Sequence, residues 1–294
     1  CFGGINMSIT DFNCTYNNGA GVNEEIVQKT KLKFPDAYKN WEDMAVLAKE
    51  IKNHEDASFC TLPFCHTLEG EALGAVINYG DERIGPRGKD YLTSSIEDLL
   101  SISELDFSKG RLEEVLKACS YLKKKKKNVA LYISGPFTIL NLLIDLRYVF
   151  KAFKKSPEVM EKILEKLRVE LLRFIREAQN MGVNIFSYGD SSGGLNILGP
   201  KLSEQIVEMF TYPLLKEAQQ IITEDSIMLL CPKTSLALIG TNKAKWKNVD
   251  LKESMKYDKA CVSMIGKAKF LGEMCIKNKN YILKDRVIKS IELI

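Results

Sequence analysis

Short apolar runs alternate along the chain with longer segments in which apolar residues recur every three or four positions. The short runs predict buried strands at 58–64, 128–136, 182–190, 226–232 and 260–266, each bounded by Gly, Pro, Asp or Asn on at least one side. Their hydrophobicity is continuous rather than alternating, which is typical of parallel strands covered on both faces.

The longer segments predict helices. Between Glu158 and Ala178 the apolar residues follow helical spacing, and Ser156 followed by Pro157 supplies a helix start. Further helices are predicted at 37–52, 111–127, 201–223 and 280–293. Strands and helices that alternate along one chain indicate an α/β fold. We expect a (β/α)8 TIM barrel rather than an open doubly wound sheet, because no GxGxxG follows the first strand.

Composition narrows the class of protein without naming an activity. With 45% apolar and 27% charged residues the chain is typical of a soluble globular protein, and a net charge of +4 does not favour nucleic-acid binding. No run of eighteen apolar residues is present, so no membrane span is expected. We expect one domain over residues 1–294, with a lead-in segment at 1–33.

Eight cysteines stand at irregular spacing, and no CxxC pair or secretory signal is visible. This pattern favours reduced thiols and a cytoplasmic location over a disulfide framework or a zinc ribbon. Histidine is scarce, since His54 and His66 are the only two in the chain, and this limits mechanisms that need an imidazole.

In a parallel barrel the reactive groups follow the C-terminal ends of the strands. The stretch 63–74 follows the first predicted strand and holds Cys65, His66, Glu69 and Glu71. They are candidate ligands or acid/base groups at the barrel mouth. The alternative is a helix capped by Thr67, with both glutamates in its first turns and a solvated histidine.

The loop 189–201 is a second candidate, because it is rich in Gly and Ser directly after a buried strand. Asp190 offers a carboxylate to a cation or a hydroxyl, and Ser191, Gly193 and Gly194 offer backbone N–H groups to an anionic ligand or cofactor. The same residues are also ordinary turn chemistry.

Cys231 and Cys275 form the third candidate, since each is expected to end a late strand. Thiolates are soft ligands suited to zinc, and a catalytic zinc needs three protein ligands and an open position. The alternative at either position is a small buried hydrophobe.

Four stretches resemble the uroporphyrinogen decarboxylase superfamily, and most closely its methylcobamide:coenzyme M methyltransferase branch. They are "FPDAYKNWEDMAVLAKE" (34–50), "PFCHTLEGEALG" (63–74), "SGPFTIL" (134–140) and "GDSSGGLNILGPKLSEQ" (189–205), and the likeness extends over about residues 34–235. The resemblance implies a (β/α)8 barrel that transfers a methyl group between a methylcobamide, carried by a corrinoid partner protein, and a small thiol-type molecule. Glu69, Glu71 and Asp190 are expected to line its site.

The resemblance also implies a zinc ion that activates the thiol, held by a His-x-Cys pair and a later cysteine. Cys231 matches the first cysteine and Thr234 a following threonine, but Leu229 stands where the histidine is expected. Cys275 matches the later cysteine, and the short spacing between the two cysteines predicts abbreviated last barrel units. His66, Cys65 or Glu69 replaces the missing ligand, or the site has lost its zinc.

The resemblance is also compatible with two other functions. The first is a non-catalytic or regulatory barrel that keeps the docking face for a corrinoid protein but has lost the zinc site. The second is the decarboxylase activity of the superfamily, which is less favoured. Residues 1–13 offer no arginine to read carboxylates, and Cys65 or a neighbour occupies the place of the aspartate that decarboxylases use.

Overall fold

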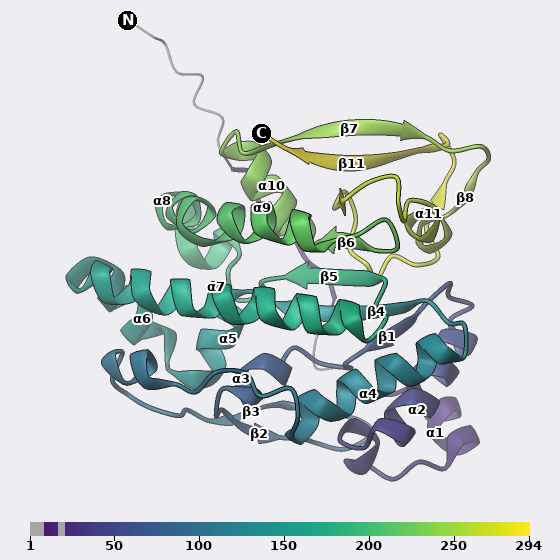
Figure 1. The fold of residues 1–294 in the computed structure, drawn as a ribbon, viewed down its shortest axis with the longest axis horizontal. Coiled ribbons are helices and arrows are strands. Elements are labelled where there is room, and N and C mark those ends of the chain that lie inside the picture. The colour runs from purple at the N-terminus through teal and green to yellow at the C-terminus, as the bar shows by residue number, and fades with distance from the viewer. Residues whose placement is uncertain (1–8, 17–20) are drawn as a thin grey trace, which may run out of the picture.

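A seven-stranded sheet forms the centre of the computed structural model, which describes residues 9–16 and 21–294 (Figure 1). The strands lie in the order β1, β4, β5, β6, β9, β11, β7. Their bounds are β1 Cys60–Leu62, β4 Val129–Ser134, β5 Ile185–Gly189, β6 Ile227–Leu230, β9 Phe270–Leu271, β11 Val287–Leu293 and β7 Ala244–Asp250. The first five pair in parallel, whereas β11 runs antiparallel to both β9 and β7. The fold is mixed α/β with a mainly parallel sheet.

The sheet ends at β1 on one side and at β7 on the other, and no ladder joins these two strands within residues 9–16 and 21–294. A closed barrel of eight parallel strands is therefore not formed by the described residues. The remaining strands form two small antiparallel sheets. In one, β2 Val76–Asn78 pairs with β3 Arg87–Asp90, and in the other, β8 Met255–Lys256 pairs with β10 Ile282–Leu283.

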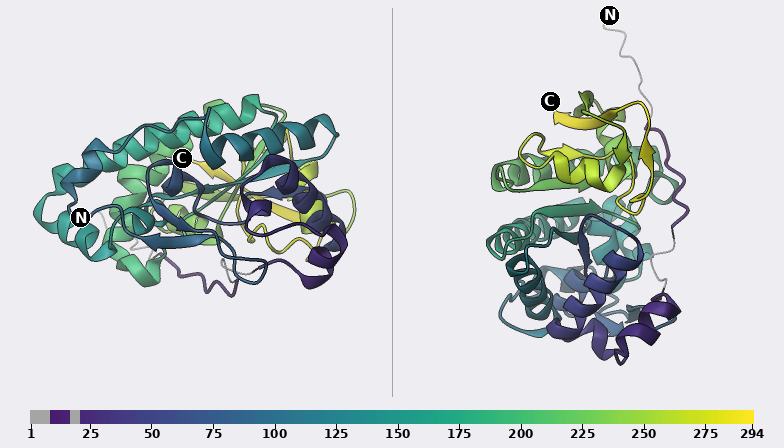
Figure 2. Two further views of the ribbon diagram at one scale, coloured as in Figure 1. Left: turned by 90° about the horizontal axis from the view of Figure 1, so that it is seen from below. Right: turned by 90° about the vertical axis from the view of Figure 1, so that its right-hand side faces the viewer.

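The helices connect the strands and cover the sheet. In the second view of Figure 2 the long helices lie along one side of the molecule, and the N-terminal segment (purple) runs along the other. Their bounds are α1 Glu24–Thr30, α2 Trp41–His54, α3 Leu68–Ala72, α4 Gly110–Lys124, α5 Pro136–Leu143, α6 Leu146–Lys155, α7 Pro157–Asn180, α8 Leu195–Ile206, α9 Tyr212–Ile221, α10 Pro232–Gly240 and α11 Tyr257–Ser263. Within the described residues, no helix combines the length and the apolar character needed to cross a membrane.

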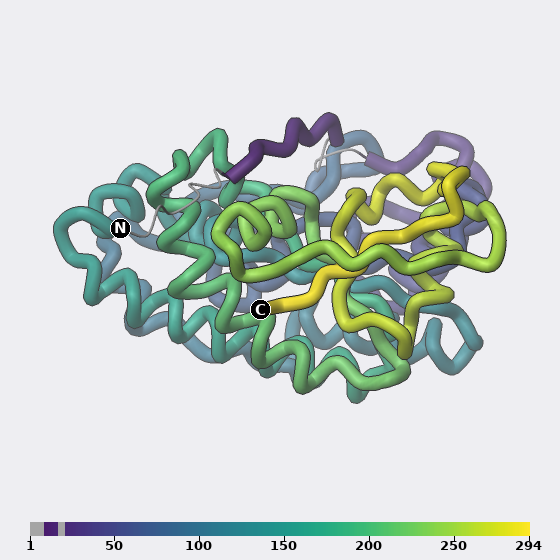
Figure 3. The backbone as a smooth tube through the Cα atoms, turned by 90° about the horizontal axis from the view of Figure 1, so that it is seen from above, coloured from purple at the N-terminus to yellow at the C-terminus, as the bar shows by residue number. Residues whose placement is uncertain are grey.

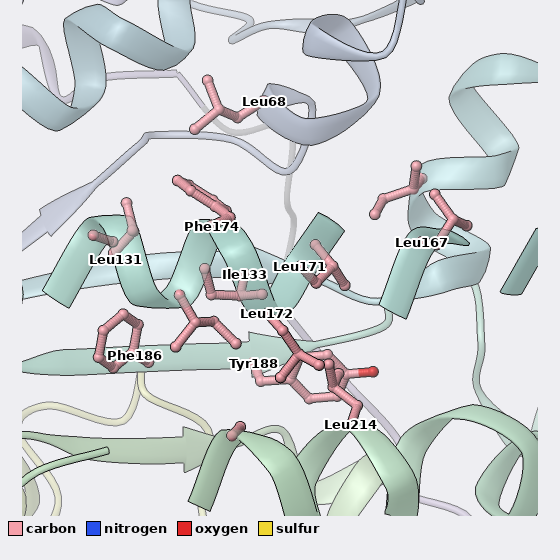
Figure 4. Packing of buried hydrophobic residues seen from close by; sticks show 14 of the residues in the cluster. Leu68, Leu131, Ile133, Leu167, Leu171, Leu172, Phe174, Phe186, Tyr188 and Leu214 are labelled. Atoms are coloured by element: carbon pink, nitrogen blue, oxygen red, sulfur yellow. The ribbon is translucent and has the colours of Figure 1, made fainter. Parts of the chain in front are cut away.

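Alternate residues of the parallel strands enter two different hydrophobic clusters, because successive side chains of a strand point to opposite faces. Leu131 and Ile133 of β4 and Phe186 of β5 pack with Phe174 of α7 in the larger cluster (Figure 4). The intervening residues, such as Ala130 of β4, pack in a second cluster with α11 and the last strands. Both faces of the sheet are thus covered, which explains the continuous apolar runs in the sequence.

Four of the five predicted strands are confirmed as β1, β4, β5 and β6, and the predicted helices between residues 37 and 223 are confirmed as α2, α4, α7 and the pair α8 and α9. Two predictions near the C-terminus are wrong. Residues 260–266 lie in and after helix α11, and Ala260 in the helix and Met264 directly after it are both buried. Residues 280–293 form β10 and β11 rather than a helix, because the β-branched side chains of this segment pack well in a sheet.

Of the lead-in segment predicted at 1–33, residues 1–8 and 17–20 lie outside the described residues. Residues 9–16 run along one edge of the molecule (Figure 3, purple). The backbone of Ile9 packs so closely on Gly240 that a Cβ at this glycine would lie 2.7 Å from the Ile9 Cα. The Tyr16 hydroxyl donates a hydrogen bond to Asn278 near the other end of the chain. The lead-in segment therefore contacts α10 and the C-terminal part.

Candidate functional site

A cavity of about 210 Å³ opens where the central parallel strands end. Parallel pairing in register brings the ends of β4, β5 and β6 to the same edge of the sheet. We call this space the thiol cavity. Its lining consists of Cys14, Tyr16, His66, Tyr132, Ser187, Tyr188, Gly189, Asp190, Ser191, Leu229, Leu230, Cys231, Lys233, Cys275, Ile276 and Lys277. Three of the lining residues carry thiols, and they come from three distant parts of the chain.

The strands contribute one row of side chains to this cavity. Tyr132, Ser187 and Leu229 are register neighbours on adjacent strands, so their side chains share the face of the sheet that lies away from α7. Leu229 is 1% exposed and packs in the second hydrophobic cluster. The position at which the resemblance expects a histidine ligand is therefore an apolar part of the cavity wall.

Cys231 and Cys275 both border the thiol cavity. Cys231 is the N-cap residue of α10, and burial raises the pKa of its thiol to about 11, with smaller contributions from Cys275 and Cys14. Cys275 follows β9 by four residues, so the prediction that it ends a strand is wrong. Burial also raises the pKa of Cys275. Both thiols are protonated at neutral pH in this environment.

His66 reaches the thiol cavity from the loop after β1. Its ring packs on Tyr132 with the ring centroids 4.8 Å apart. Burial lowers the pKa of His66 to about 4, and the nearby Lys277 ammonium adds to this effect. The imidazole is therefore neutral at neutral pH. Its Nδ1 is buried and has no hydrogen-bond partner among the described residues.

Cys231, Cys275 and His66 have the donor chemistry of a zinc site, since thiolates and neutral imidazoles are the usual zinc ligands. Their arrangement does not fit one. Among residues 9–16 and 21–294, no group of three or more His, Cys, Asp or Glu side chains is placed to hold a metal ion. Leu229 cannot coordinate a metal. The residues therefore share a cavity without forming a metal centre.

The two glutamates predicted to line the site are engaged elsewhere, and neither is among the residues that border the thiol cavity. Glu69 is 1% exposed and accepts a hydrogen bond of 2.7 Å from the backbone N–H of Ser134, at the end of β4. Burial raises the pKa of Glu69. Glu71 accepts a hydrogen bond of 2.6 Å from Arg111 Nε and another from the Tyr79 hydroxyl. Both carboxylates hold the α3 region against neighbouring elements.

Arg111 is the centre of this buried network, and the sequence offered no pattern that singled it out. Its side chain is 3% exposed, and besides Glu71 its guanidinium donates to Thr67 Oγ1 at 2.6 Å and to Cys65 Sγ at 3.2 Å. Thr67 is the N-cap residue of α3 as predicted, but its hydroxyl makes no capping bond to the backbone. Cys65 is thus a hydrogen-bond partner of a buried cation.

Asp190 directly follows β5, as predicted, and borders the thiol cavity, but its carboxylate accepts hydrogen bonds from the neighbouring helix α5. It accepts hydrogen bonds from the backbone N–H groups of Phe137 and Thr138, at 3.0 and 2.7 Å, and from the Thr138 hydroxyl at 2.7 Å. Burial raises the pKa of Asp190, and these bonds counteract the rise. A Cβ at Gly135 would lie 2.4 Å from the Asp190 Cβ, so the contact requires glycine there.

The three remaining candidates lie in the loop that follows Asp190. Ser191 borders the thiol cavity, and its hydroxyl is 3.1 Å from the Thr138 hydroxyl. A Cβ at Gly193 would lie 2.4 Å from the Asp190 carboxylate, so a glycine at position 193 leaves room for the Asp190 side chain. Gly194 is the N-cap residue of α8. Their predicted role in binding a cofactor stays a prediction.

One known protein family matches most of the chain. The family model for uroporphyrinogen decarboxylase (URO-D) matches residues 12–275. The chain belongs to the URO-D family.

Two curated relatives of this URO-D chain share a name and an organism. The methylcobamide:CoM methyltransferase MtaA of Methanosarcina barkeri (strain Fusaro) is 22% identical over 238 residues, which cover 79% of this chain and 68% of the relative. A second MtaA from Methanosarcina barkeri is 21% identical over 236 residues, with the same two shares. The URO-D chain is thus distantly related to these methyltransferases.

A solved structure is also similar. It is a methyltransferase from Methanosarcina mazei, with a TM-score of 0.60 and 20% sequence identity. The match covers 74% of the URO-D chain and 65% of the solved chain, so this chain spans less than two thirds of that length. At this identity the similarity shows a shared fold.

Several residues that line the thiol cavity of this URO-D protein could not be recognised as site residues from the sequence. Cys14 lies in the lead-in segment, outside every predicted strand and helix. Tyr132 looked like a core residue of a strand, and Lys277 follows Cys275 by two positions in a segment without periodicity. The Lys277 ammonium lies 5.7 Å from the centre of the Tyr16 ring, which places both ends of the chain at the cavity.

The thiols of the URO-D protein should differ sharply in reactivity. Iodoacetamide at neutral pH is expected to alkylate Cys14, which is exposed, well before Cys231. Labelling of Cys231 should rise as pH approaches its pKa of about 11, because only the thiolate reacts. Mass spectrometry of proteolytic peptides measures both rates. Equal rates at neutral pH would contradict the burial of Cys231, and the unfolded protein in urea serves as the control.

Proposed function

We propose that this URO-D family member transfers a methyl group between a methylcobamide and a small thiol that binds in the thiol cavity. One observation carries the proposal: Cys231, Cys275 and His66 border a single cavity at the C-terminal ends of the parallel strands. This edge is where parallel α/β folds place their active sites. The distant relation to methylcobamide:CoM methyltransferases supports the same chemistry.

The residues of the cavity suit a thiol acceptor. Methyl transfer to sulfur removes the thiol proton, forms a sulfur–carbon bond and breaks the carbon–cobalt bond, whose electron pair stays on cobalt. Lys233 and Lys277 border the cavity, and their positive charges favour a bound thiolate over the neutral thiol. Burial lowers the pKa of Lys277, so an anionic sulfur beside it also stabilises its ammonium form. Leu229 and Ile276 supply apolar contacts.

The methyl donor is expected to arrive on a corrinoid protein, which would dock over the same edge of the sheet. We assign no step to zinc, because the donors around the thiol cavity do not form a metal centre in the described residues. The thiol must then be activated by the electrostatics of the cavity rather than by a Lewis acid.

We further propose that the sheet is an abbreviated (β/α)8 barrel, in which the antiparallel strands β11 and β7 stand in place of the last parallel units. The parallel order of β1, β4, β5, β6 and β9 supports this view, as does membership of the URO-D family. The short spacing between Cys231 and Cys275 agrees with it.

The activity is tested with purified protein, methylcobalamin and 2-mercaptoethanesulfonate. Loss of the methylcobalamin absorbance and formation of the methyl thioether are followed together. Lys277→Met should slow the reaction by about a hundredfold, the usual cost of removing one preorganised charge. Lys245→Met, on the exposed edge strand β7, is the matched control and should leave the rate unchanged. A wild-type rate no faster than that in buffer would contradict the proposal.

A second function is favoured by the apolar wall at Leu229. A barrel without a metal centre can keep its docking face and act as a non-catalytic or regulatory partner of a corrinoid protein. Binding of a corrinoid protein without any methyl transfer to thiols would support this function over the first.

A further inference from the structure

A second cavity, of about 470 Å³, adjoins the thiol cavity. It is bordered by β1 with the loop that follows it, by the end of α2 and by the segment after Cys275. Tyr16, His66, Tyr132 and Lys277 line both cavities. A space of this size is within the range of sites that bind small molecules.

Two buried polar atoms of the second cavity lack a partner. Thr61 Oγ1 and His66 Nδ1 make no hydrogen bond within the described part of the chain. Thr61 in β1 pairs with Ala130 in β4, so its side chain faces the same side of the sheet as that of Tyr132, two residues further along β4. The His66 ring packs on the Tyr132 ring on this side. Buried polar groups normally have partners, so two at one cavity indicate a ligand that forms hydrogen bonds.

The charged side chains of the lining favour a neutral ligand. Lys279 lies 2.5 Å from the Glu55 carboxylate, so these two charges satisfy each other. Lys277 also has an interaction partner, and His66 is uncharged at neutral pH because burial lowers its pKa to about 4. A charged ligand would therefore lose its hydration without gaining a counter-charge, which costs far more than burying a neutral polar group.

Aromatic rings supply most of the apolar lining of the second cavity. Tyr38 and Phe64 lie with their ring centroids 6.0 Å apart, and Tyr132 and Tyr16 border the same space. Such rings favour contact with another flat ring, through stacked or edge-on arrangements. The ligand that matches this lining is thus an aromatic ring with an uncharged polar group.

A hydroxyl group matches the two polar atoms best, because it donates one hydrogen bond and accepts others. The Thr61 hydroxyl has a proton to donate, and a neutral imidazole has one nitrogen that accepts. A single hydroxyl group on the ligand can therefore serve both atoms at once.

We propose that the second cavity binds a small neutral phenol. The phenol hydroxyl donates a hydrogen bond to His66 Nδ1 and accepts one from the Thr61 hydroxyl. Its ring lies among Tyr38, Phe64 and Tyr132. This binding site is separate from methyl transfer in the thiol cavity, and its occupancy fixes the orientation and the tautomer of the histidine that both cavities share.

Isothermal titration calorimetry of the full chain with phenol tests the site. Phenol should bind, whereas toluene, which has a methyl group in place of the hydroxyl, should bind at least tenfold more weakly. Benzoate, which carries a charge, should also bind at least tenfold more weakly. Thr61→Val keeps the side-chain volume and removes only the hydroxyl, so it should weaken phenol binding by about fivefold. Thermal unfolding should show no loss of stability in this variant, because the removed hydroxyl has no partner to lose.

Nitrogen NMR of the imidazoles measures the second hydrogen bond directly. The chain has two histidines, so few resonances need to be assigned. Saturation with phenol should shift the Nδ1 resonance of His66 and leave those of His54 in place, because the His54 side chain is 37% exposed and borders neither cavity.

Ser203→Ala is the matched control, because the Ser203 hydroxyl is also buried without a partner but borders a different cavity. It should leave phenol binding unchanged. The proposal is overturned if phenol gives no binding heat at millimolar concentration, or if toluene or benzoate binds as tightly as phenol. It is also overturned if a stably folded Thr61→Val variant keeps the wild-type affinity, or if the His66 resonance does not move. None of these outcomes bears on the methyl-transfer assay, which uses none of the three ligands.

Discussion

Replacing Arg111 by leucine is expected to lower the free energy of unfolding by about 3–5 kcal/mol, the usual loss when one partner of a buried ion pair is removed. The guanidinium is 3% exposed and serves Glu71, Thr67 and Cys65 at once. Leucine fills part of the space but donates no hydrogen bond. The Glu71 carboxylate, which is 18% exposed, is then left beside an apolar side chain.

Urea denaturation followed by circular dichroism measures this loss. Arg147→Leu is the control, because Arg147 forms its ion pair with Asp145 on the surface, where its side chain is 86% exposed. Surface pairs contribute little to stability, so this variant should unfold at nearly the wild-type urea concentration. If Arg111→Leu is as stable as the control, the network around Arg111 does not hold α3 to α4.

The second large effect is expected at Asp190. Asp190→Ala should lower the free energy of unfolding by about 3–5 kcal/mol, since three buried donors lose their acceptor and each costs about 1–3 kcal/mol when unpaired. These donors are the N–H groups of Phe137 and Thr138 and the Thr138 hydroxyl. They lie in the first turn of α5, so the variant uncouples the end of β5 from that helix.

Asp190→Asn distinguishes the loss of acceptors from the loss of side-chain volume. Its amide oxygen still accepts from one or two of the donors, so the loss should be about half that of alanine. Asp145→Ala, which removes a surface acceptor at the start of α6, should be far milder. Thermal unfolding monitored by calorimetry compares the three variants. Equal stability of Asp190→Ala and Asp145→Ala would show that the Asp190 carboxylate does not hold α5.

The prediction of the fold succeeded where structure depends on neighbours in the sequence. The strands β4, β5 and β6 are buried on both faces, so their apolar runs are unbroken and easy to recognise. Helix α7 places its apolar residues on one side at regular spacing. The C-terminal part was predicted wrongly because its short apolar segments suit either a helix or a strand. Pairing of β11 with β7, more than thirty residues away, decided between them.

The residues of the candidate site were also predicted only in part. Strand order alone suggested that His66, Asp190 and Cys231 follow strands that end at one edge, and the structure places all three at the thiol cavity. Glu69 and Glu71 were expected beside them because they are close in sequence. Their side chains instead contact Ser134 and Arg111, about 65 and 40 positions away. Proximity in the chain does not determine the direction of a side chain on a short helix.

Local periodicity and turn residues were enough to establish the α/β class, the parallel central strands and the edge of the sheet at which His66, Asp190 and Cys231 lie. These properties depend on hydrophobic burial, and the spacing of apolar residues within each segment indicates which of its side chains are buried. The open ends of the sheet, the arrival of Cys14 and Lys277 at the cavity and the absence of a metal centre among the described residues were decided by tertiary contacts. Such contacts join distant segments through a few specific side chains, so the pattern of residues within one segment does not predict them.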